Sequence, residues 1–468
     1  MLTAAAIAGK CLGALYRIPL TRVLGAQGMG MFQSVFPLYA LLVTVCGGGL
    51  TAAVSKLTAE SEGRAALHTA LKAALVVSLP LVAAAALLCR LIAAAAGAPA
   101  AALALCVLLP AVPVSAVCAA FRGYFQGMGN MMPSAVGQCV EQAAKFAVGI
   151  SLAFAFSRVS LTAAVAGCAA GVTASEGVMF CFFYWRYKRH AAGGAGLPLP
   201  PALNAAADGS VFAGLDALTE VSEELVPAPA VVTAARAQNA PVARRLLAVS
   251  LPVMLGMLVL PLCQVADSFI VVNLLVKHGA ARAYATALYG LVTGPINALV
   301  NMPAVLTVGL CGSLLPKVSQ LVKRGESVRK TAARVLLFAF AAGAVFCVGI
   351  VLFASPALRI LYGNTLGVPM VTVTRLLRTA GVAVLSIAVM QTASAVLQGA
   401  GKAYLPAVHL LIAAVVKESL LFVLLPRLGA YGFVAATDIF YALACVLDLI
   451  ALYFCLRRRT RKKAKARG

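Results

Sequence analysis

Charged residues are scarce in this sequence. They make up 11% of its 468 residues, against 62% hydrophobic residues, and the mean hydropathy is +0.97. Soluble domains hold about 25% charged residues, so the composition argues against a water-soluble enzyme. Acids are the rarer charged class, with 14 Asp and Glu against 38 Lys and Arg, but too little polar sequence remains to form the basic face of a nucleic-acid-binding protein. We therefore expect a multi-spanning membrane protein without a nucleic-acid partner.

The sequence also lacks the patterns of common catalytic sites. The thirteen cysteines stand singly, nearly all in apolar runs, and the four histidines lie far apart, so no metal-binding spacing occurs. Gly399-Ala-Gly401-Lys402 is followed by Ala403 and has no glycine six residues before the lysine, which excludes a phosphate-binding P-loop there. We expect the chain not to be an enzyme and to need neither a cofactor nor a resident metal. The function that remains is transport without ATP hydrolysis by this chain.

Apolar segments long enough to cross a bilayer recur along the chain. Six of them lie near residues 2–24, 31–54, 67–92, 103–121, 134–156 and 161–185. Six more lie near residues 246–274, 286–314, 331–354, 379–397, 404–425 and 431–455. They predict an all-α integral membrane protein with about twelve transmembrane helices.

Polar segments divide the chain into domains. Residues 187–243 are rich in Ala, Gly and Pro and hold five of the fourteen acids, which predicts a flexible linker. Residues 457–468 form a basic tail. A six-helix bundle is expected over 1–186 and another over 244–456. If the linker, the tail and both termini are cytoplasmic, 25 Lys and Arg fall on the inner side and 9 on the outer side, in agreement with the positive-inside rule.

The two halves resemble repeats. Three short motifs recur in the same order at offsets of 258 to 273 residues. The pairs are Phe36-Pro37 with Gly294-Pro295, Ser55-Lys56-Leu57 with Pro316-Lys317-Val318, and Gln126-Gly-Met-Gly129 with Gln398-Gly-Ala-Gly401. Six helices return the chain to its starting side, so both copies insert with the same orientation. This predicts two pseudo-symmetric six-helix bundles around a central cavity, an arrangement typical of transporters.

Basic side chains within the spans are candidates for binding an anionic substrate. Each charge within a span costs roughly 2.5–3.5 kcal/mol at a helix centre unless it faces protein or water. The basic candidates are Lys10, Arg17, Arg22, Lys145 and Lys417. Lys10 and Arg17 are seven residues apart and share a helix face, whereas Arg22 is expected to reach the outer interface. A structural role for these residues stays open.

Acidic side chains within the spans are candidates for ion coupling. Glu141 lies four residues before Lys145 and can pair with it. Glu418 follows Lys417 directly, at a comparable place in the second repeat. Asp267 is the strongest single candidate among the acids. Two roles stay open for Glu141, Asp267 and Glu418: they either couple transport to Na⁺ or H⁺ or form structural ion pairs.

Several motifs of the first half stand out from the apolar background. They are residues 13–30 (GALYRIPLTRVLGAQGMG), 33–39 (QSVFPLY), 55–60 (SKLTAE), 122–127 (RGYFQG) and 138–142 (QCVEQ). In these motifs the chain resembles the stage V sporulation protein B family, within the multidrug/oligosaccharidyl-lipid/polysaccharide exporter superfamily. The second half agrees more loosely, in its organisation and in residues 398–401 (QGAG).

The resemblance implies a function. It implies a bacterial plasma-membrane flippase that moves a polyprenyl-pyrophosphate-linked saccharide to the outer leaflet by alternating access, for cell-wall, spore-cortex or polysaccharide synthesis. Its partners would be that substrate and membrane lipids, and we expect a monomer, with contact to the cell-wall synthesis machinery left open. By matching motifs, Arg17, Arg22 and Lys56 would meet the substrate, and Glu141 lies in the matching VEQ segment. Arg and Lys are suited to a pyrophosphate.

Two departures from the superfamily pattern concern the substrate. The second span reads Thr44-Val-Cys-Gly47 where lipid II flippases of the superfamily place arginines, and the chain has about twelve spans where many relatives have fourteen. Two other functions therefore stay open. One is a cation-coupled multidrug exporter whose acids meet cationic drugs, and the other is a membrane scaffold for a cell-wall or spore-coat assembly.

Overall fold

The computed structural model describes residues 2–192, 241–303, 314, 318, 320–321, 328–363, 365–402 and 404–465. These residues form helices and no strand. Most of the predicted linker 187–243 and the end of the predicted tail 457–468 lie outside the described residues, so these domain boundaries stay predictions. The last part of the predicted span 286–314 also lies outside them.

The first half of the chain folds into one helical bundle. Its helices are α1 (Leu2–Gly47), α2 (Leu50–Leu57), η1 (Thr58–Glu62), α3 (Gly63–Leu87), α4 (Cys89–Ala95), η2 (Pro99–Ala101), α5 (Ala102–Leu108), α6 (Ala111–Gly127), α7 (Met132–Ser157) and α8 (Leu161–Ala192). α1 is two helices joined across a kink at Gly25, which agrees with the break predicted between the first two spans. Only Gly25 leaves the helical conformation there, with φ 63°, which a residue without Cβ adopts readily.

The second half supplies most of the other bundle. Its helices are α11 (Val242–Met257), α12 (Val259–Lys277), α13 (Arg282–Leu291), η3 (Val292–Ile296), α14 (Asn297–Asn301), α16 (Val328–Tyr362), α17 (Met370–Ala380), α18 (Ala383–Gly399), α19 (Tyr404–Leu428) and α20 (Ala430–Lys465). The predicted span 246–274 divides between α11 and α12. Pro261 explains the break, since it has no N–H to bond the carbonyl of Met257.

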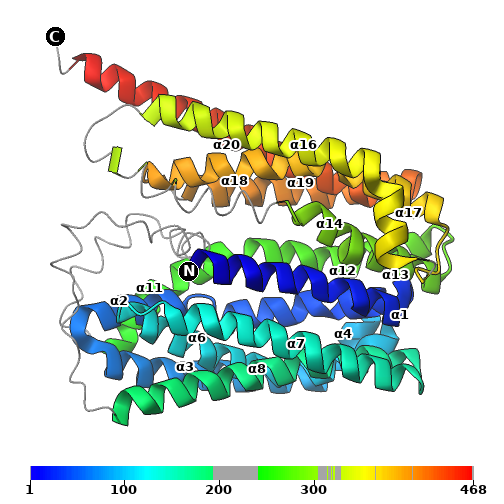
Figure 1. Cartoon of the computed structure of the whole chain (residues 1–468), viewed down its shortest axis with the longest axis horizontal. Helices are drawn as coiled ribbons and strands as arrows, with labels where there is room; N and C mark the ends of the chain where they lie inside the picture. Colours follow the sequence, from blue (N-terminus) through cyan, green and yellow to red (C-terminus); the bar gives the residue numbers. More distant parts are fainter. Residues whose placement is uncertain are drawn as a thin grey trace.

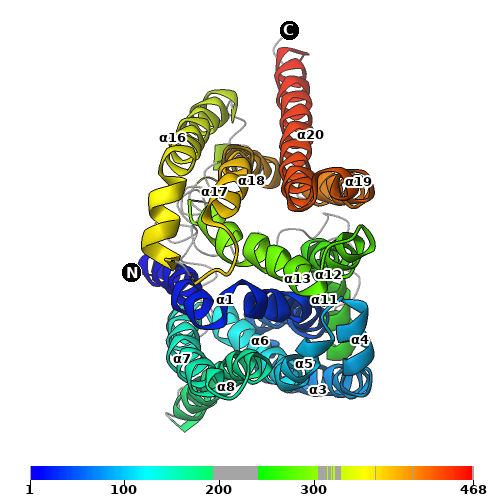
Figure 2. The same ribbon diagram turned by 90° about the vertical axis from the view of Figure 1, so that its right-hand side faces the viewer.

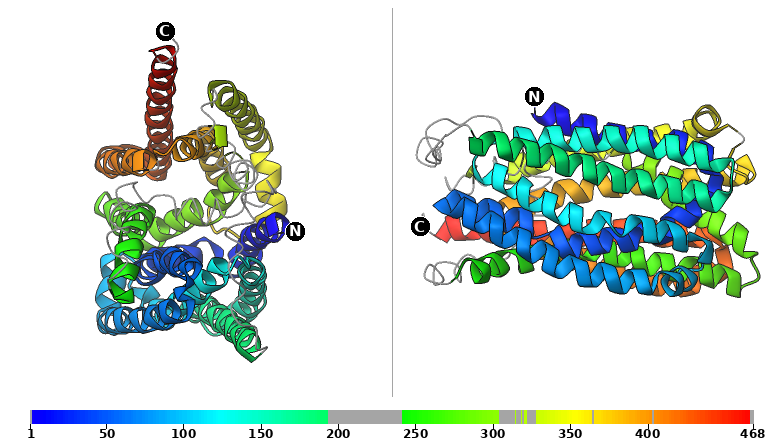
Figure 3. Two further views of the ribbon diagram at one scale, coloured as in Figure 1. Left: turned by 90° about the vertical axis from the view of Figure 1, so that its left-hand side faces the viewer. Right: turned by 90° about the horizontal axis from the view of Figure 1, so that it is seen from below.

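Eleven helical segments of the described residues are long and apolar enough to cross a membrane. The first, Leu15–Glu60, contains parts of both of the first two predicted spans, so it counts for two. Views along the helices show the two halves side by side (Figure 2 and the left panel of Figure 3), and each half has its own hydrophobic core. The predicted fold class is therefore confirmed. Many large apolar side chains point outward, such as Leu87 and Val345, as they do where lipid is the solvent.

The predicted repeats share a turn. α6 and α18 both end in the QGxG motif, and Gly129 and Gly401 both have positive φ, at 74° and 79°. The N–H groups of the following residues, Asn130 and Lys402, bond to the carbonyl five residues back at 3.0 and 2.9 Å. This is the same helix-ending motif in both halves. The motif that recurs in the sequence therefore has the same backbone conformation in both halves.

Close packing joins the halves at the end opposite the termini (Figure 1). There α1 lies so near α13 that a Cβ on Gly30 or on Gly290 would overlap the backbone of the other helix. Arg22 also donates two hydrogen bonds of 2.6 Å to the carbonyls of Leu361 and Ile360 in α16. This end of the interface is closed.

At the end that holds the termini, α11 packs on the first half. Leu246 belongs to the core of the first half, although it follows the linker. Arg245 forms ion pairs with Glu60 at 2.5 Å and with Glu62 at 2.6 Å, both from η1. The break before Pro261 thus lets α11 pack with the first half, while α12 packs with the second half and with α1.

Candidate functional site

A cavity of about 260 Å³ lies between the two halves. Both halves line it: α1 supplies Arg17, Gln33, Phe36 and Pro37, and the second half supplies Cys263, Gln264, Asp267, Tyr289, Thr293, Asn297, Lys417, Thr437, Asp438 and apolar neighbours. Charged groups and amides thus share a mostly aromatic and aliphatic wall. A cavity of this kind is suited to a ligand with a polar head and an apolar remainder.

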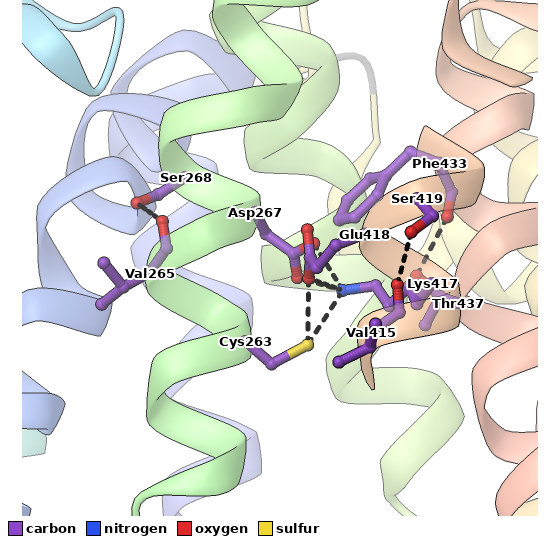
Figure 4. A network of polar contacts seen from close by, with 10 residues as sticks. All are labelled: Cys263, Val265, Asp267, Ser268, Val415, Lys417, Glu418, Ser419, Phe433 and Thr437. Atoms are coloured by element: carbon purple, nitrogen blue, oxygen red, sulfur yellow. Dashed lines mark hydrogen bonds and ion pairs between the residues drawn. The ribbon is translucent and has the colours of Figure 1, made fainter. Parts of the chain in front are cut away.

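One wall of the cavity carries an ionic cluster, here called the Lys417 cluster: Cys263, Asp267, Lys417 and Glu418 (Figure 4). The Lys417 ammonium bonds both carboxylate oxygens of Asp267, with 2.5 Å to Oδ2. It lies 3.4 Å from the sulfur of Cys263 and 3.5 Å from Glu418 Oε1. The Cys263 thiol donates to the same Glu418 oxygen at 3.2 Å. The ammonium of Lys417 is therefore the shared counter-charge of two carboxylates, those of Asp267 and Glu418.

The fold explains how the Lys417 cluster assembles. Cys263 and Asp267 are one turn apart on α12, and α12 packs against α19, which carries Lys417. Only 3% of Lys417 and 7% of Asp267 are exposed, so each charge depends on the other rather than on solvent. The rings of Phe433 and Phe440 in α20 lie 5.6 and 6.0 Å from the ammonium and add cation–π attraction.

Arg17 of α1 also lines the cavity. Its Nη1 donates to the carbonyl of Gly294 at 3.5 Å, and Gln33 Nε2 donates to the carbonyl of Thr293 at 3.0 Å. Both carbonyls belong to η3, where Pro295 lacks a donor and interrupts the regular backbone pattern. Arg17 has no acidic partner among the described contacts, so its charge faces the cavity with only a long hydrogen bond to a neutral group.

The structure brings some of the predicted site residues together and separates others. Arg17, Asp267 and Lys417 line the cavity, and Glu418 completes the Lys417 cluster. The remaining predicted residues lie elsewhere: Arg22 is exposed and bonds α16, Lys56 is half-buried on α2, Glu141 pairs with Lys145 at 2.9 Å on α7, and the side chain of Lys10 lies outside the described ones.

Two acids inside the helices have a larger role in the structure than the sequence suggested. Glu176 and Asp448 lie in the predicted spans 161–185 and 431–455 but are not among the candidate site residues named from the sequence. α8 continues to Ala192 and α20 to Lys465, so both acids lie well inside their helices. Asp448 accepts hydrogen bonds from His409 at 2.6 Å and from Ser394 at 2.5 Å, and Glu176 is 5% exposed. The rarity of acids in apolar runs was the signal for both.

Comparison with known proteins shows what this chain is similar to. The model of the polysaccharide biosynthesis protein family matches residues 1–200. Stage V sporulation protein B of Bacillus subtilis (strain 168) is 26% identical over 447 residues, which cover 92% of this chain and 78% of that protein. The predicted family resemblance is confirmed. Lipid II flippase MurJ of the same organism is 24% identical over 495 residues, covering 97% of this chain and 81% of MurJ.

Solved structures show the same fold at low identity. A multidrug resistance MATE family transporter of the MOP superfamily in its inward-facing conformation aligns with a TM-score of 0.74 at 14% identity, over 97% of this chain and 96% of the other. An outward-facing structure of such a transporter aligns with a TM-score of 0.61 at 15% identity, over 98% and 95%. These likenesses show that the chain shares the fold of such transporters.

Proposed function

We propose that the chain is a flippase that carries a polyprenyl-pyrophosphate-linked saccharide to the outer leaflet, for cell-wall, spore-cortex or polysaccharide synthesis. The observation that carries the proposal is the cavity between the halves, which holds one cation from each half, Arg17 and Lys417. Relatives named as a sporulation protein and a lipid II flippase support it. In this proposal the protein is a monomer of the bacterial plasma membrane with both termini in the cytoplasm.

The two cations differ in how they would bind a pyrophosphate. Arg17 faces the cavity without an acidic partner, and its planar guanidinium can bond two phosphate oxygens at once. Lys417 is held by Asp267 and Glu418, so an anion must compete with two carboxylates for it. Arg17 is therefore the primary anchor of the proposal. The polyprenyl tail would stay in the bilayer while the pyrophosphate and saccharide pass between the halves.

A cation-coupled multidrug exporter is less well supported. Its acids would have to be available to cationic drugs, but Glu141 is paired with Lys145, and Asp267 and Glu418 share Lys417, which leaves Asp438 as the cavity acid without an ion pair among the described residues. At the paired acids, a drug would have to displace an ammonium that is already buried.

Replacing Arg17 with alanine is expected to weaken binding of the lipid-linked saccharide by about 10- to 150-fold, because a hydrogen bond to a charged group contributes about 1.5–3 kcal/mol. The measurement uses the full chain in liposomes with a fluorescent polyprenyl-pyrophosphate saccharide, scored for saturable binding and for crossing between leaflets. Arg158→Ala, an exposed arginine beside the ring of Phe154, is the matched control and should bind like the unchanged protein.

Folding is checked alongside, by the amount of each variant in the membrane and by its thermal unfolding. Arg17→Lys keeps the positive charge and should retain part of the binding. Equal binding by Arg17→Ala and the unchanged protein would remove Arg17 from the site. Absence of saturable binding in well-folded unchanged protein would refute the flippase proposal itself.

A further inference from the structure

Glu176 is a buried acid that the proposed transport site does not use. It lies on α8 inside the first half and is 5% exposed. Its Oε1 accepts a hydrogen bond from the Tyr39 hydroxyl of α1 at 3.3 Å, and its Oε2 is buried without a hydrogen bond to protein. An ionised carboxylate is very costly in such a place unless a cation pairs with it.

Most other acids of the described residues have such a partner. The pairs are Glu60 and Glu62 with Arg245, Glu141 with Lys145, Asp267 and Glu418 with Lys417, and Asp448 with His409. Glu176 forms no ion pair with a described residue, and neither does Asp438 at the cavity wall. Of these two, only Glu176 is buried. It is therefore the acid for which a proton is the simplest counter-charge.

The charged groups around Glu176 leave it without a dedicated cation. Glu141 and Lys145 of α7 and Arg122 of α6 act on it electrostatically, together with Tyr39 of α1. Cys118 of α6 is a further titratable neighbour. The ammonium of Lys145 is bonded to Glu141 at 2.9 Å, so these two charges largely cancel. The guanidinium of Arg122 is directed to the sulfur of Met179 at 3.6 Å.

Tyr39 links Glu176 to the cavity. It lies two residues beyond Pro37 on α1, and Phe36 and Pro37 line the cavity wall. Pro37 cannot donate a backbone hydrogen bond, so α1 is able to bend at this level. The bond from Tyr39 to Glu176 therefore fixes a segment of α1 next to a point of flexure and next to the proposed substrate.

We propose that Glu176 is a proton-binding site of the first half, and that its protonation sets the position of α1 at the cavity. With the proton bound, the neutral carboxyl accepts the hydrogen bond of Tyr39 and stays buried. After the proton leaves, the carboxylate requires water or a cation, so the contact between α8 and α1 must rearrange and change the cavity wall. The inference rests on the proposed function only in taking transport as the step that the proton drives.

The proton site is tested by infrared spectroscopy of the full chain in lipid nanodiscs, titrated from acidic to alkaline pH. The unchanged protein should show the C=O band of a carboxyl that stays protonated after the exposed acids have ionised and that disappears only at higher pH. Glu176→Gln should abolish this band. Glu141→Gln and Asp438→Asn, which remove a paired acid and the cavity acid, should keep it. Tyr39→Phe should keep it at a shifted frequency, because the hydrogen bond to the carbonyl is lost.

A band that persists in Glu176→Gln, or that vanishes in Asp438→Asn instead, would overturn the assignment. Coupling is tested separately by crossing of the fluorescent lipid-linked saccharide with and without a pH gradient. The gradient should accelerate crossing in the unchanged protein and not in Glu176→Gln, whose binding of the saccharide should be unaltered. Equal acceleration in both would overturn the coupling. The infrared result needs no saccharide, so failure of the proton site and failure of the flippase proposal are distinguishable.

Discussion

Replacing Lys417 with methionine is expected to lower the free energy of unfolding by about 3–5 kcal/mol, because removal of one partner of a buried pair leaves an uncompensated buried charge. Asp267 is 7% exposed and would lose the ammonium that bonds both of its oxygens, and Glu418 would lose its nearest cation. Methionine has a similar length, so the change removes the charge with little change in volume. The measurement is denaturant-induced unfolding of the purified chain in detergent.

Two further variants separate lost charge from lost packing. Lys402→Met replaces an exposed lysine near a tyrosine ring and is expected to change stability by at most about 0.5 kcal/mol. Combining Lys417→Met with Asp267→Asn removes both charges of the closest pair and should recover much of the loss. Equal stability of Lys417→Met and Lys402→Met would contradict the buried pair, and so would a double variant less stable than Lys417→Met alone.

The overall fold was predictable from the sequence because span length and apolar composition are local properties. A run of about 20 apolar residues must cross the bilayer as a helix whatever its neighbours are. The break between α11 and α12 was harder to predict from the sequence. Pro261 predicts a kink, but only the packing of α11 on α2 and α3 decides that the two pieces join different halves.

The sequence predicted which residues belong to the candidate site, but it did not predict which of them contact each other. Asp267, Lys417 and Glu418 stand out as charges within apolar runs. The sequence predicted no partner for Asp267, whereas the structure pairs it with Lys417, 150 residues away. That contact depends on the packing of α12 against α19, which no periodicity of either helix encodes. Glu176 was underrated for a local reason, since the predicted span 161–185 ended seven residues before α8 does.

Replacing Gly290 with leucine is expected to open the end of the interface that is closed in this structure. A Cβ at Gly290 would overlap the backbone of α1 at Gly30, so the side chain can be accommodated only if α13 and α1 separate. Overpacking of this kind costs about 1–3 kcal/mol, which would shift the balance between closed and open states by about 5- to 150-fold. With the termini in the cytoplasm as proposed, the end that opens is the outer one.

Cys263 is a native reporter for this opening, because it lines the cavity and is 8% exposed. A membrane-impermeant thiol reagent added outside should modify Cys263 in Gly290→Leu and leave it unmodified in the unchanged protein, as measured by mass spectrometry of the Cys263 peptide. Gly349→Leu is the matched control, since a Cβ there meets no atom within 4 Å. Protection of Cys263 in both variants would show that the contact of Gly290 with Gly30 does not hold the outer end closed. Modification in both variants would show that access to the cavity does not depend on the contact between α1 and α13, because Gly290 lies at that contact and Gly349 does not.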